Sequence, residues 1–165
     1  MGLFAEVLPL LSRLALQSPQ VGAVQRRFAT VGLVAGGSGI TPMLRLVRAV
    51  AAERRAAADS GRAPPCSLAL VFANASPEDV PFRAELEVLA RSGDLRLSLI
   101  VSRVDPQWPH VVGHVDARVL AAGLPSPAKD VLLVLCGPPG LVHDTCVPAL
   151  RQLGHDVQPS RCVTL

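Results

Sequence analysis

The chain has 165 residues, half of them hydrophobic, and a formal net charge of +3 that comes from 16 basic and 13 acidic residues. This length suits one well-packed domain and is short for two. No uninterrupted apolar run approaches the roughly 20 residues that cross a bilayer. The basic excess is small and lacks basic blocks or interleaved aromatic residues, which argues against a nucleic-acid partner.

The first 30 residues contain a single acid and a leucine-rich amphipathic run that ends near Arg26-Arg27-Phe28. Basic, acid-poor amphipathic leaders are typical of mitochondrial targeting peptides. An equally open alternative is that this segment is the remnant or replacement of a missing upstream domain. On either interpretation, residues 31–165 are expected to form the folded domain.

An apolar run from Val31 to Ala35 stops at the glycine cluster Gly36-Gly37-Ser38-Gly39, and apolar residues at helical spacing follow the pair Thr41-Pro42. This pattern predicts a strand, a tight turn and a helix to about Ala58. Thr41 is expected to cap that helix, with Pro42 at its first position. Free backbone N–H groups at a positive helix end favour phosphate, so the turn predicts a phosphate site.

The rest of the chain alternates further apolar strands with helical patterns. The expected strands are 67–73, 95–101, 131–135 and 161–165, and the expected helices are 82–90, a short one ending near Gly123, and one from Leu141 to Leu153. This alternation predicts an α/β fold, an open parallel sheet of about five strands with helices on both faces, as in Rossmann-like nucleotide-binding domains.

In such a sheet, ligands bind beyond the carboxyl ends of the strands, where the winding reverses. If strands 31–35 and 131–135 are neighbours there, the turns Gly36–Gly39 and Cys136–Gly140 line one crevice. The first turn lacks the Lys-Ser/Thr ending of a P-loop, which disfavours nucleoside triphosphate hydrolysis. It also has Pro42 where the usual dinucleotide fingerprint has a third glycine, and Asn74 stands where an acid would bind ribose.

The two turns together are more specific than either alone. Ala35 to Met43, combined with Cys136-Gly137-Pro138-Pro139, resembles the nicotinamide-nucleotide domain of the ferredoxin-NADP reductase superfamily, and within it the NADH-cytochrome b5 reductases. Leu70 to Asn74, Gly154-His155 and Arg161-Cys162 add to a resemblance that covers residues 31–165.

The resemblance implies a role for each matching residue. The pyrophosphate and the adjoining ribose would be held by Gly36, Gly37, Ser38, Gly39, Thr41 and Pro42, and the adenosine side would be lined by Phe72 and Asn74. Cys136, Gly137 and Pro138 would lie against the nicotinamide. Cys136 would orient its C4 carbon towards the flavin N5 without acting as a nucleophile, because hydride transfer needs alignment and no covalent intermediate. The alternative for Cys136 is a small buried hydrophobe at a strand end.

Three departures from the family pattern stand out. Ser38 replaces a usual threonine, and Gly140-Leu141 replaces a usual proline and methionine, which loosens the cysteine turn. The pair Ser102-Arg103 stands where members that prefer NADH have an acid before the arginine. A Ser-Arg pair can hydrogen-bond and neutralise a 2′-phosphate, so NADPH is expected to be accepted as well as NADH. The alternative is that Arg103 is an exposed loop residue.

The side chains of the four cysteines and four histidines do not indicate a metal centre. The cysteines lie far apart without a Cys-x-x-Cys pair, which indicates reduced thiols and an intracellular protein, mitochondrial if residues 1–30 are a leader. His110 and His114 are separated by four positions, but Gly113 and neighbouring prolines disfavour a helical metal pair. A structural or surface role is therefore expected for all the histidines.

Reductases of this family carry a flavin-binding barrel before the nucleotide domain. The first 30 residues are too few for such a barrel and hold no tyrosine for its motif, so FAD is expected only with a flavin-binding domain or subunit as partner. One function is then the nucleotide-binding lobe of an NAD(P)H reductase that passes hydride to FAD for one-electron reduction of a haem acceptor such as cytochrome b5. The alternative is a non-catalytic nucleotide-binding or interaction protein derived from such a reductase.

Overall fold

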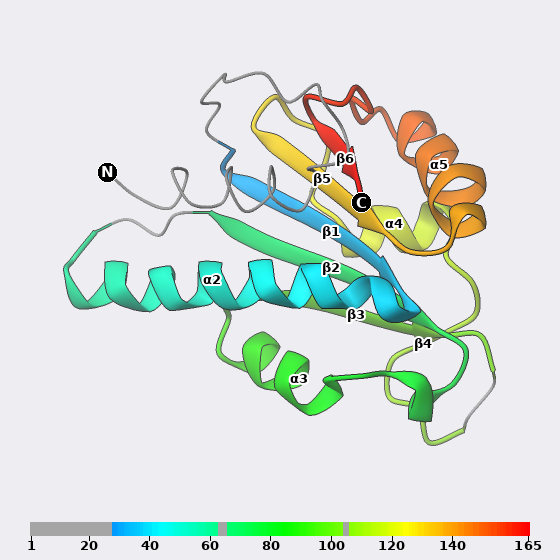
Figure 1. Ribbon diagram of the computed structural model, residues 1–165, viewed down its shortest axis with the longest axis horizontal. Helices are drawn as coiled ribbons and strands as arrows, with labels where there is room; N and C mark the ends of the chain where they lie inside the picture. Colours follow the sequence, from blue (N-terminus) through cyan, green and yellow to red (C-terminus); the bar gives the residue numbers. More distant parts are fainter. Residues whose placement is uncertain (1–27, 63–65, 104–105) are drawn as a thin grey trace.

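The structure, a computed structural model, describes residues 28–62, 66–103 and 106–165 (Figure 1). Its centre is a six-stranded sheet in the order β4-β3-β2-β1-β5-β6, and each of the strand pairs is parallel. The strands are β1 Thr30–Gly36, β2 Ser67–Asn74, β3 Arg96–Val101, β4 Val111–Val112, β5 Val131–Cys136 and β6 Cys162–Thr164.

The connections between the strands are helical. The α-helices are α2 Ile40–Asp59, α3 Arg83–Arg91, α4 Ala117–Gly123 and α5 Val147–Gln152. Short 3-10 turns occupy η1 Gly37–Gly39 and η2 Pro77–Asp79, and a π-helix, η3, spans Gly140–Cys146. Among the helices of the described segments, none is long and apolar enough to cross a membrane.

Helices cover both faces of the sheet, with α2 and α3 on one face and α4 and α5 on the other (Figure 1). Successive strand residues point to opposite faces, so Leu33 joins the cluster under α2, whereas Val34 joins the cluster under α4 and α5. A strand covered on both sides must be apolar throughout, which explains the unbroken apolar runs of β1, β2 and β5. The predicted α/β parallel sheet with helices on both faces is confirmed.

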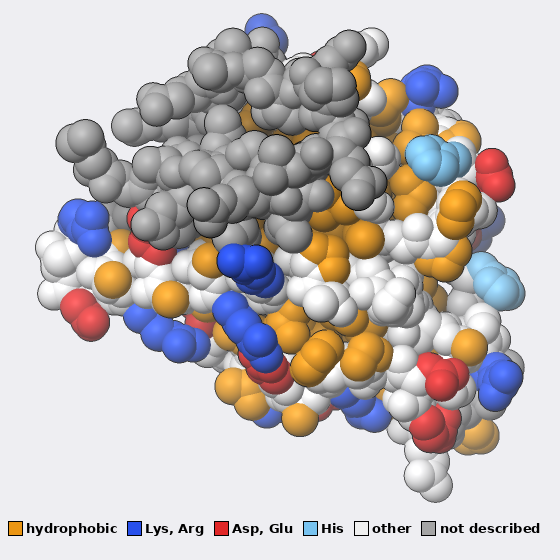
Figure 2. All heavy atoms as spheres, viewed as in Figure 1, with side chains coloured by type: hydrophobic (Ala, Val, Ile, Leu, Met, Phe, Trp, Pro, Cys, Tyr) orange, Lys and Arg blue, Asp and Glu red, His pale blue; other side chains and the backbone are white. Residues whose placement is uncertain are grey.

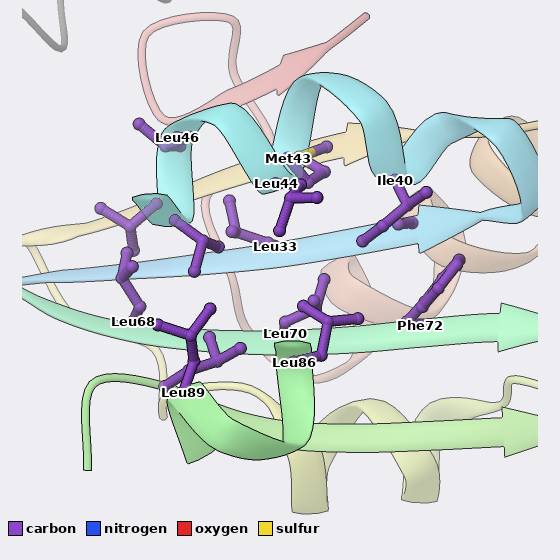
Figure 3. Packing of buried hydrophobic residues seen from close by; sticks show 14 of the residues in the cluster. Leu33, Ile40, Met43, Leu44, Leu46, Leu68, Leu70, Phe72, Leu86 and Leu89 are labelled. Atoms are coloured by element: carbon purple, nitrogen blue, oxygen red, sulfur yellow. The ribbon is translucent and has the colours of Figure 1, made fainter. Parts of the chain in front are cut away.

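The core on the α2 face is built from leucines of the helices and the strands. Met43 and Leu44 of α2 lie over Leu33, while Leu86 and Leu89 of α3 reach towards β2 (Figure 3). Leu33 and Leu86 are fully buried, and burying a side chain of this size stabilises a fold by about 1.5–3 kcal/mol. This layer holds the start of α2 firmly over the carboxyl ends of the strands.

The sheet has one strand more than the five that the sequence predicts. The added strand, β4, has two residues, Val111 and Val112, and pairs only with β3. Both side chains are 41% exposed, and the strand lies in a proline-rich passage. Two half-exposed residues are too few to show an alternating pattern, so β4 is defined by its neighbour and not by its own sequence.

The predicted cap of the first helix is wrong. The η1 turn runs directly into α2, whose N-cap is Gly39, with φ −60° and ψ −10° and no side-chain capping bond. Thr41 and Pro42 are therefore the second and third residues of a helix that begins at Ile40. Pro42 still fits, because the first four N–H groups of a helix have no intrahelical acceptor to lose.

The remaining elements follow the sequence-based predictions, except that the helix after β5 begins as the π-helix η3. Val142 and Leu150 are buried as predicted, and Leu141 and Val147 are half-buried. At the other end of the chain, Phe28 is buried in the core and β1 begins at Thr30. The two hypotheses for residues 1–30 concern mostly residues 1–27, which lie outside the described residues.

Candidate functional site

The winding of the sheet reverses at β1. This strand pairs with β2 on one side and with β5 on the other, in a register that sets Ala35 opposite both Phe72 and Cys136. The turns that follow β1 and β5 therefore leave the same edge of the sheet next to each other, as the sequence predicts. In open α/β sheets this reversal point is the usual ligand site.

The two turns meet backbone to backbone, and glycines make the contact feasible. A Cβ atom on Gly39 would collide with the carbonyl of Cys136 and lie 3.0 Å from the backbone nitrogen of Gly137. A Cβ on Gly137 would in turn lie 3.1 Å from the nitrogen of Gly36. Any larger residue would push the turns apart, so these glycines serve close approach more than flexibility.

Gly37 differs from Gly39 and Gly137, because it faces open space and has no backbone close to its Cβ position. Its φ of +53° favours glycine, and nothing lies within 4 Å of where its Cβ would be. Ser38 and Thr41, on the same turn and the first turn of α2, are exposed. The site thus offers backbone N–H groups, two hydroxyls and the positive end of a 20-residue helix, which together suit a phosphate group.

A cleft of about 440 Å³ opens beside these turns and extends across the ends of β2, β3 and β4. Of the residues predicted for the site, five line this cleft: Gly36, Gly37, Asn74, Ser102 and Pro138. The other lining residues are Ala73, Ala75, Asp79, Gly113, His114, Val115 and Leu141. Elements that are distant in sequence thus supply one continuous surface, with the two glycine turns at one end.

Asn74 has an unpaired polar group beside the cleft. Its Nδ2 atom is buried and has no hydrogen-bond partner, although the residue lines the cleft. Leaving a buried donor unpaired costs about 1–3 kcal/mol. If the amide turned towards the cleft, a ligand acceptor such as a ribose or base atom could satisfy it.

Ser102 and Arg103 continue β3 past its last paired residue. The backbone N–H groups of Ser102 and Arg103 donate to the carbonyls of Asn74 (3.2 Å) and Ala75 (2.9 Å). The Ser102 hydroxyl donates to the same Ala75 carbonyl at 3.3 Å, so it would have to turn away from this carbonyl to donate to a ligand phosphate. Arg103 is exposed. This geometry fits both a phosphate-binding pair and a solvated loop residue, so the sequence-based alternatives for Arg103 both stand.

The comparison with known families agrees with this geometry. Residues 33–147 match the family described as "Oxidoreductase NAD-binding domain". The chain belongs to this family. The match begins inside β1 and ends at the first residue of α5, so it contains both glycine turns of the NAD-binding domain.

Relatives of the NAD-binding domain are cytochrome b5 reductases. The chain is 38% identical to NADH-cytochrome b5 reductase 2 of Danio rerio over 132 residues, 79% of this chain and 40% of the relative. It is 36% identical to NADH-cytochrome b5 reductase 3 of Mus musculus over 143 residues, 86% of this chain and 44% of the relative. The chain therefore spans less than half the length of these relatives.

A solved structure shows the same fold. The cytochrome b5 reductase domain of Ulva prolifera nitrate reductase superposes with a TM-score of 0.73 at 26% identity, covering 84% of this chain and 50% of that one. The predicted resemblance to the ferredoxin-NADP reductase superfamily, in its nucleotide-binding domain only, is thereby confirmed.

Cys136 is the last residue of β5 in the NAD-binding domain, and its side chain is half-buried against the core. Burial raises the pKa of its thiol, so the thiol stays protonated at neutral pH and is a poor nucleophile. A positioning role and a purely structural role both agree with this. The other three cysteines are buried and free, and burial raises the pKa of each thiol to about 11.

Phe72 requires a correction. The sequence-based expectation places it on the adenosine side, but its side chain is fully buried in the core on the α2 face. It lies near Ile40, from the first turn of α2 (Figure 3). Asn74 lies two residues further along β2, beyond the part of the strand that α2 covers, and it lines the cleft. Phe72 is thus part of the core beneath the site, and its side chain has no exposed surface for a ligand to contact.

The sequence reasoning missed two ionisable residues of the cleft, Asp79 and His114. Asp79 lies in η2, after β2, where its carboxylate accepts a hydrogen bond from the Ser76 hydroxyl at 2.8 Å. His114 follows β4, and its side chain is exposed. Cleft residues of this kind can be sought in the sequence just after the carboxyl end of each strand, because ligands bind there in open α/β sheets. His114 could not be found in this way, because the sequence does not predict the strand β4 that precedes it.

Proposed function

We propose that this NAD-binding domain is the nucleotide-binding lobe of a flavin-dependent NAD(P)H reductase. The observation that carries the proposal is the contact between the Gly36–Gly39 turn and the Cys136–Gly140 turn at the reversal point of the sheet. This contact opens onto a cleft that contains an unpaired buried amide donor. The names of the relatives, which are NADH-cytochrome b5 reductases, support the same conclusion.

A nicotinamide dinucleotide would lie along the cleft. Its pyrophosphate would bind the N–H groups of Gly36, Gly37 and Gly39, with Ser38, Thr41 and Pro42 at the rim. The Nδ2 atom of Asn74 would donate to the adenosine half. The nicotinamide would lie against Cys136, Gly137 and Pro138. In this arrangement every anionic group of the ligand meets backbone donors or a helix N-terminus, and no lysine is required.

A bound nicotinamide would supply a hydride from its C4 carbon to the flavin of a partner domain. The chain itself would contribute alignment: the neutral thiol of Cys136 and the Gly137-Pro138 turn would orient the nicotinamide ring. FAD would be held by a flavin-binding domain or subunit. The final acceptor would be a one-electron haem protein such as cytochrome b5, and the protein would act inside the cell, in mitochondria if residues 1–30 are a targeting segment.

We further propose that the site accepts NADPH as well as NADH. Ser102 lines the cleft and the exposed Arg103 follows it directly, so a 2′-phosphate of the adenosine ribose would project towards this pair. The Ser102 hydroxyl, once turned from the Ala75 carbonyl, could donate to this phosphate, and a guanidinium can bind it with two parallel hydrogen bonds. An acid before the arginine would repel it.

Calorimetric titration of the purified chain with NADH and with NADPH tests this function. We expect both nucleotides to bind and Cys136→Ala to keep both affinities. Arg103→Ala should weaken NADPH by about tenfold, since a hydrogen bond to a charged group is worth about 1.5 kcal/mol or more, while changing NADH less than about twofold. A chain that is folded by circular dichroism and binds neither nucleotide at millimolar concentration would overturn the proposal. It would favour the non-catalytic interaction protein instead.

The reductase step needs a second measurement. The chain is mixed with the flavin-binding domain of a cytochrome b5 reductase, and reduction of FAD by NADH is followed by absorbance. We expect the wild-type chain to support reduction and Cys136→Ala to slow it without a change in NADH affinity, because the cysteine acts on alignment. Equal rates for both would remove Cys136 from the mechanism and leave the binding function intact.

A further inference from the structure

The side chain of Leu141 lies at the junction of the two glycine turns. A Cβ atom on Gly36 would collide with Leu141 Cδ2, and a Cβ on Gly137 would lie 3.2 Å from the same atom. The leucine thus occupies the space beside both turns that larger residues at the two glycines would fill. If either turn moved away from the other, a gap would open beside Leu141, and packed interiors leave few such gaps.

Leu141 also connects the core to the cleft. Its half-buried side chain packs against the core cluster under α4 and α5, and the same residue lines the cleft. A side chain with both contacts can transfer the fixed position of the core to the surface that a ligand meets. The two turns are therefore held together from the cleft side as well as through their backbones.

Hydrogen bonds hold the backbone on both sides of Leu141. The Val142 N–H donates to the Pro138 carbonyl at 3.1 Å, and the Thr145 hydroxyl donates to the Gly140 carbonyl at 3.2 Å. The second bond closes within the π-helix η3, and π-helical turns are rare and frequent at functional sites. Gly140 alone would leave its own backbone free, so the hydroxyl of Thr145 supplies a constraint that the glycine lacks.

Thr145 acts on the site only through this backbone. It is half-buried, and it is not among the described residues that line the cleft. Its hydroxyl is engaged with Gly140, so it holds the segment from which the Leu141 side chain projects. Removing the hydroxyl should affect a ligand less than removing the leucine, because the bond between Val142 and Pro138 remains.

We propose that Leu141 is a positioning residue of the nucleotide site and that Thr145 holds it in place. Leu141 fixes the Cys136–Gly140 turn relative to the Gly36–Gly39 turn. A dinucleotide whose pyrophosphate binds the second of these turns then presents its nicotinamide half to the first, in one orientation. The inference rests on the proposed nucleotide-binding function and adds to it two residues that supply no hydrogen bond to the ligand.

The test compares the affinities of the purified chain for NADH and for ADP-ribose, which lacks the nicotinamide ring, by calorimetry. We expect Leu141→Ala to weaken NADH by about fivefold, roughly the effect of one CH₂-sized contact, and ADP-ribose by less than about twofold. Leu141→Met keeps an apolar side chain of similar volume, so it should bind NADH within about twofold of the wild-type chain.

Leu153→Ala is the matched control for the leucine. Leu153 is half-buried, packs against the same core cluster and is not among the described residues of the cleft. Its truncation should lower the free energy of unfolding as Leu141→Ala does, but it should leave the NADH affinity unchanged. Thr145→Val should weaken NADH by about twofold, the lower end for a neutral hydrogen bond, and Thr145→Ser should restore the affinity.

Hydrogen exchange in the ligand-free chain tests the same role without a nucleotide. The amides of Gly36, Gly37 and Gly137 should exchange faster in Leu141→Ala than in Leu153→Ala, because the turns lose a shared contact. If the two variants exchange alike and bind NADH alike, or if Leu141→Ala weakens NADH and ADP-ribose equally, the inference is wrong and the proposed function stands. If the wild-type chain binds neither ligand, the proposed function fails and this inference fails with it.

Discussion

The cleft has one end made of backbone and one end made of side chains. At the first end, Gly36, Gly39 and Gly137 bring two turns into direct contact, and a single added Cβ has no room. At the second, the polar residues Asn74, Ser102 and His114 line the cleft. The backbone end has little freedom to vary, because its geometry is part of the fold. The side-chain end can change without disturbing the core, so discrimination between ligands belongs there.

The largest effect is expected from Gly39→Ala. The new Cβ would meet the backbone of Cys136, which cannot rotate away as a side chain can. We expect a loss of about 1–3 kcal/mol in the free energy of unfolding, as for an overpacked core, and weakened binding of NADH and NADPH alike. Urea unfolding and calorimetry measure the two quantities.

Gly140→Ala is the matched control for that substitution. It places the same methyl group on the cysteine turn, where the nearest atom, Asp144 Oδ2, would lie at an ordinary 3.7 Å. If Gly39→Ala proved as stable as Gly140→Ala and bound nucleotides as well, the turns would not depend on their backbone contact.

Asn74→Leu should separate binding from stability at the side-chain end. The substitution removes a buried donor without a partner, so the free energy of unfolding should stay constant or rise. Both nucleotides should bind about tenfold more weakly, because a ligand acceptor loses a hydrogen bond worth about 1–1.5 kcal/mol. Parallel urea unfolding and titration provide the measurement. A loss of stability with unchanged binding would show that Asn74 serves the fold and not the ligand.

Ser102→Asp should change selectivity without changing the fold. The added carboxylate at the cleft would repel a 2′-phosphate, and we expect about tenfold weaker NADPH binding at low ionic strength with little change for NADH. Ser102→Asn, which is uncharged, is the control. The effect should shrink as salt is added. Equal weakening of both nucleotides would place the 2′-position away from Ser102.

The smallest effect concerns the thiol of Cys136. Because burial raises its pKa, a smaller fraction is thiolate at about pH 8 than for an ordinary cysteine, and alkylation by iodoacetamide should be slow and should accelerate as the pH rises. Bound NADH should slow it further by covering the residue. Mass spectrometry after timed labelling follows the reaction. Fast labelling at neutral pH would indicate an activated thiol and would contradict a passive positioning role.

Much of the molecule was predictable from local sequence. The unbroken apolar runs of β1, β2 and β5 indicated strands covered on both faces, and the glycine clusters after β1 and β5 indicated where the backbone turns. These signals are local because an apolar run or a glycine changes the conformations available to its own segment. The family resemblance of the two turns then indicated the nucleotide-binding domain.

Only the tertiary structure decided which side chains reach the cleft. Phe72 and Asn74 lie two residues apart on one strand, yet α2 covers the first and leaves the second at the cleft. Thr41 is no cap, because η1 merges with α2, and β4 exists only through its pairing with β3. Asp79 and His114 meet at one site because separate loops end at the same edge of the sheet. Each of these outcomes depends on contacts between segments far apart in the chain, and local sequence patterns carry no information about such contacts.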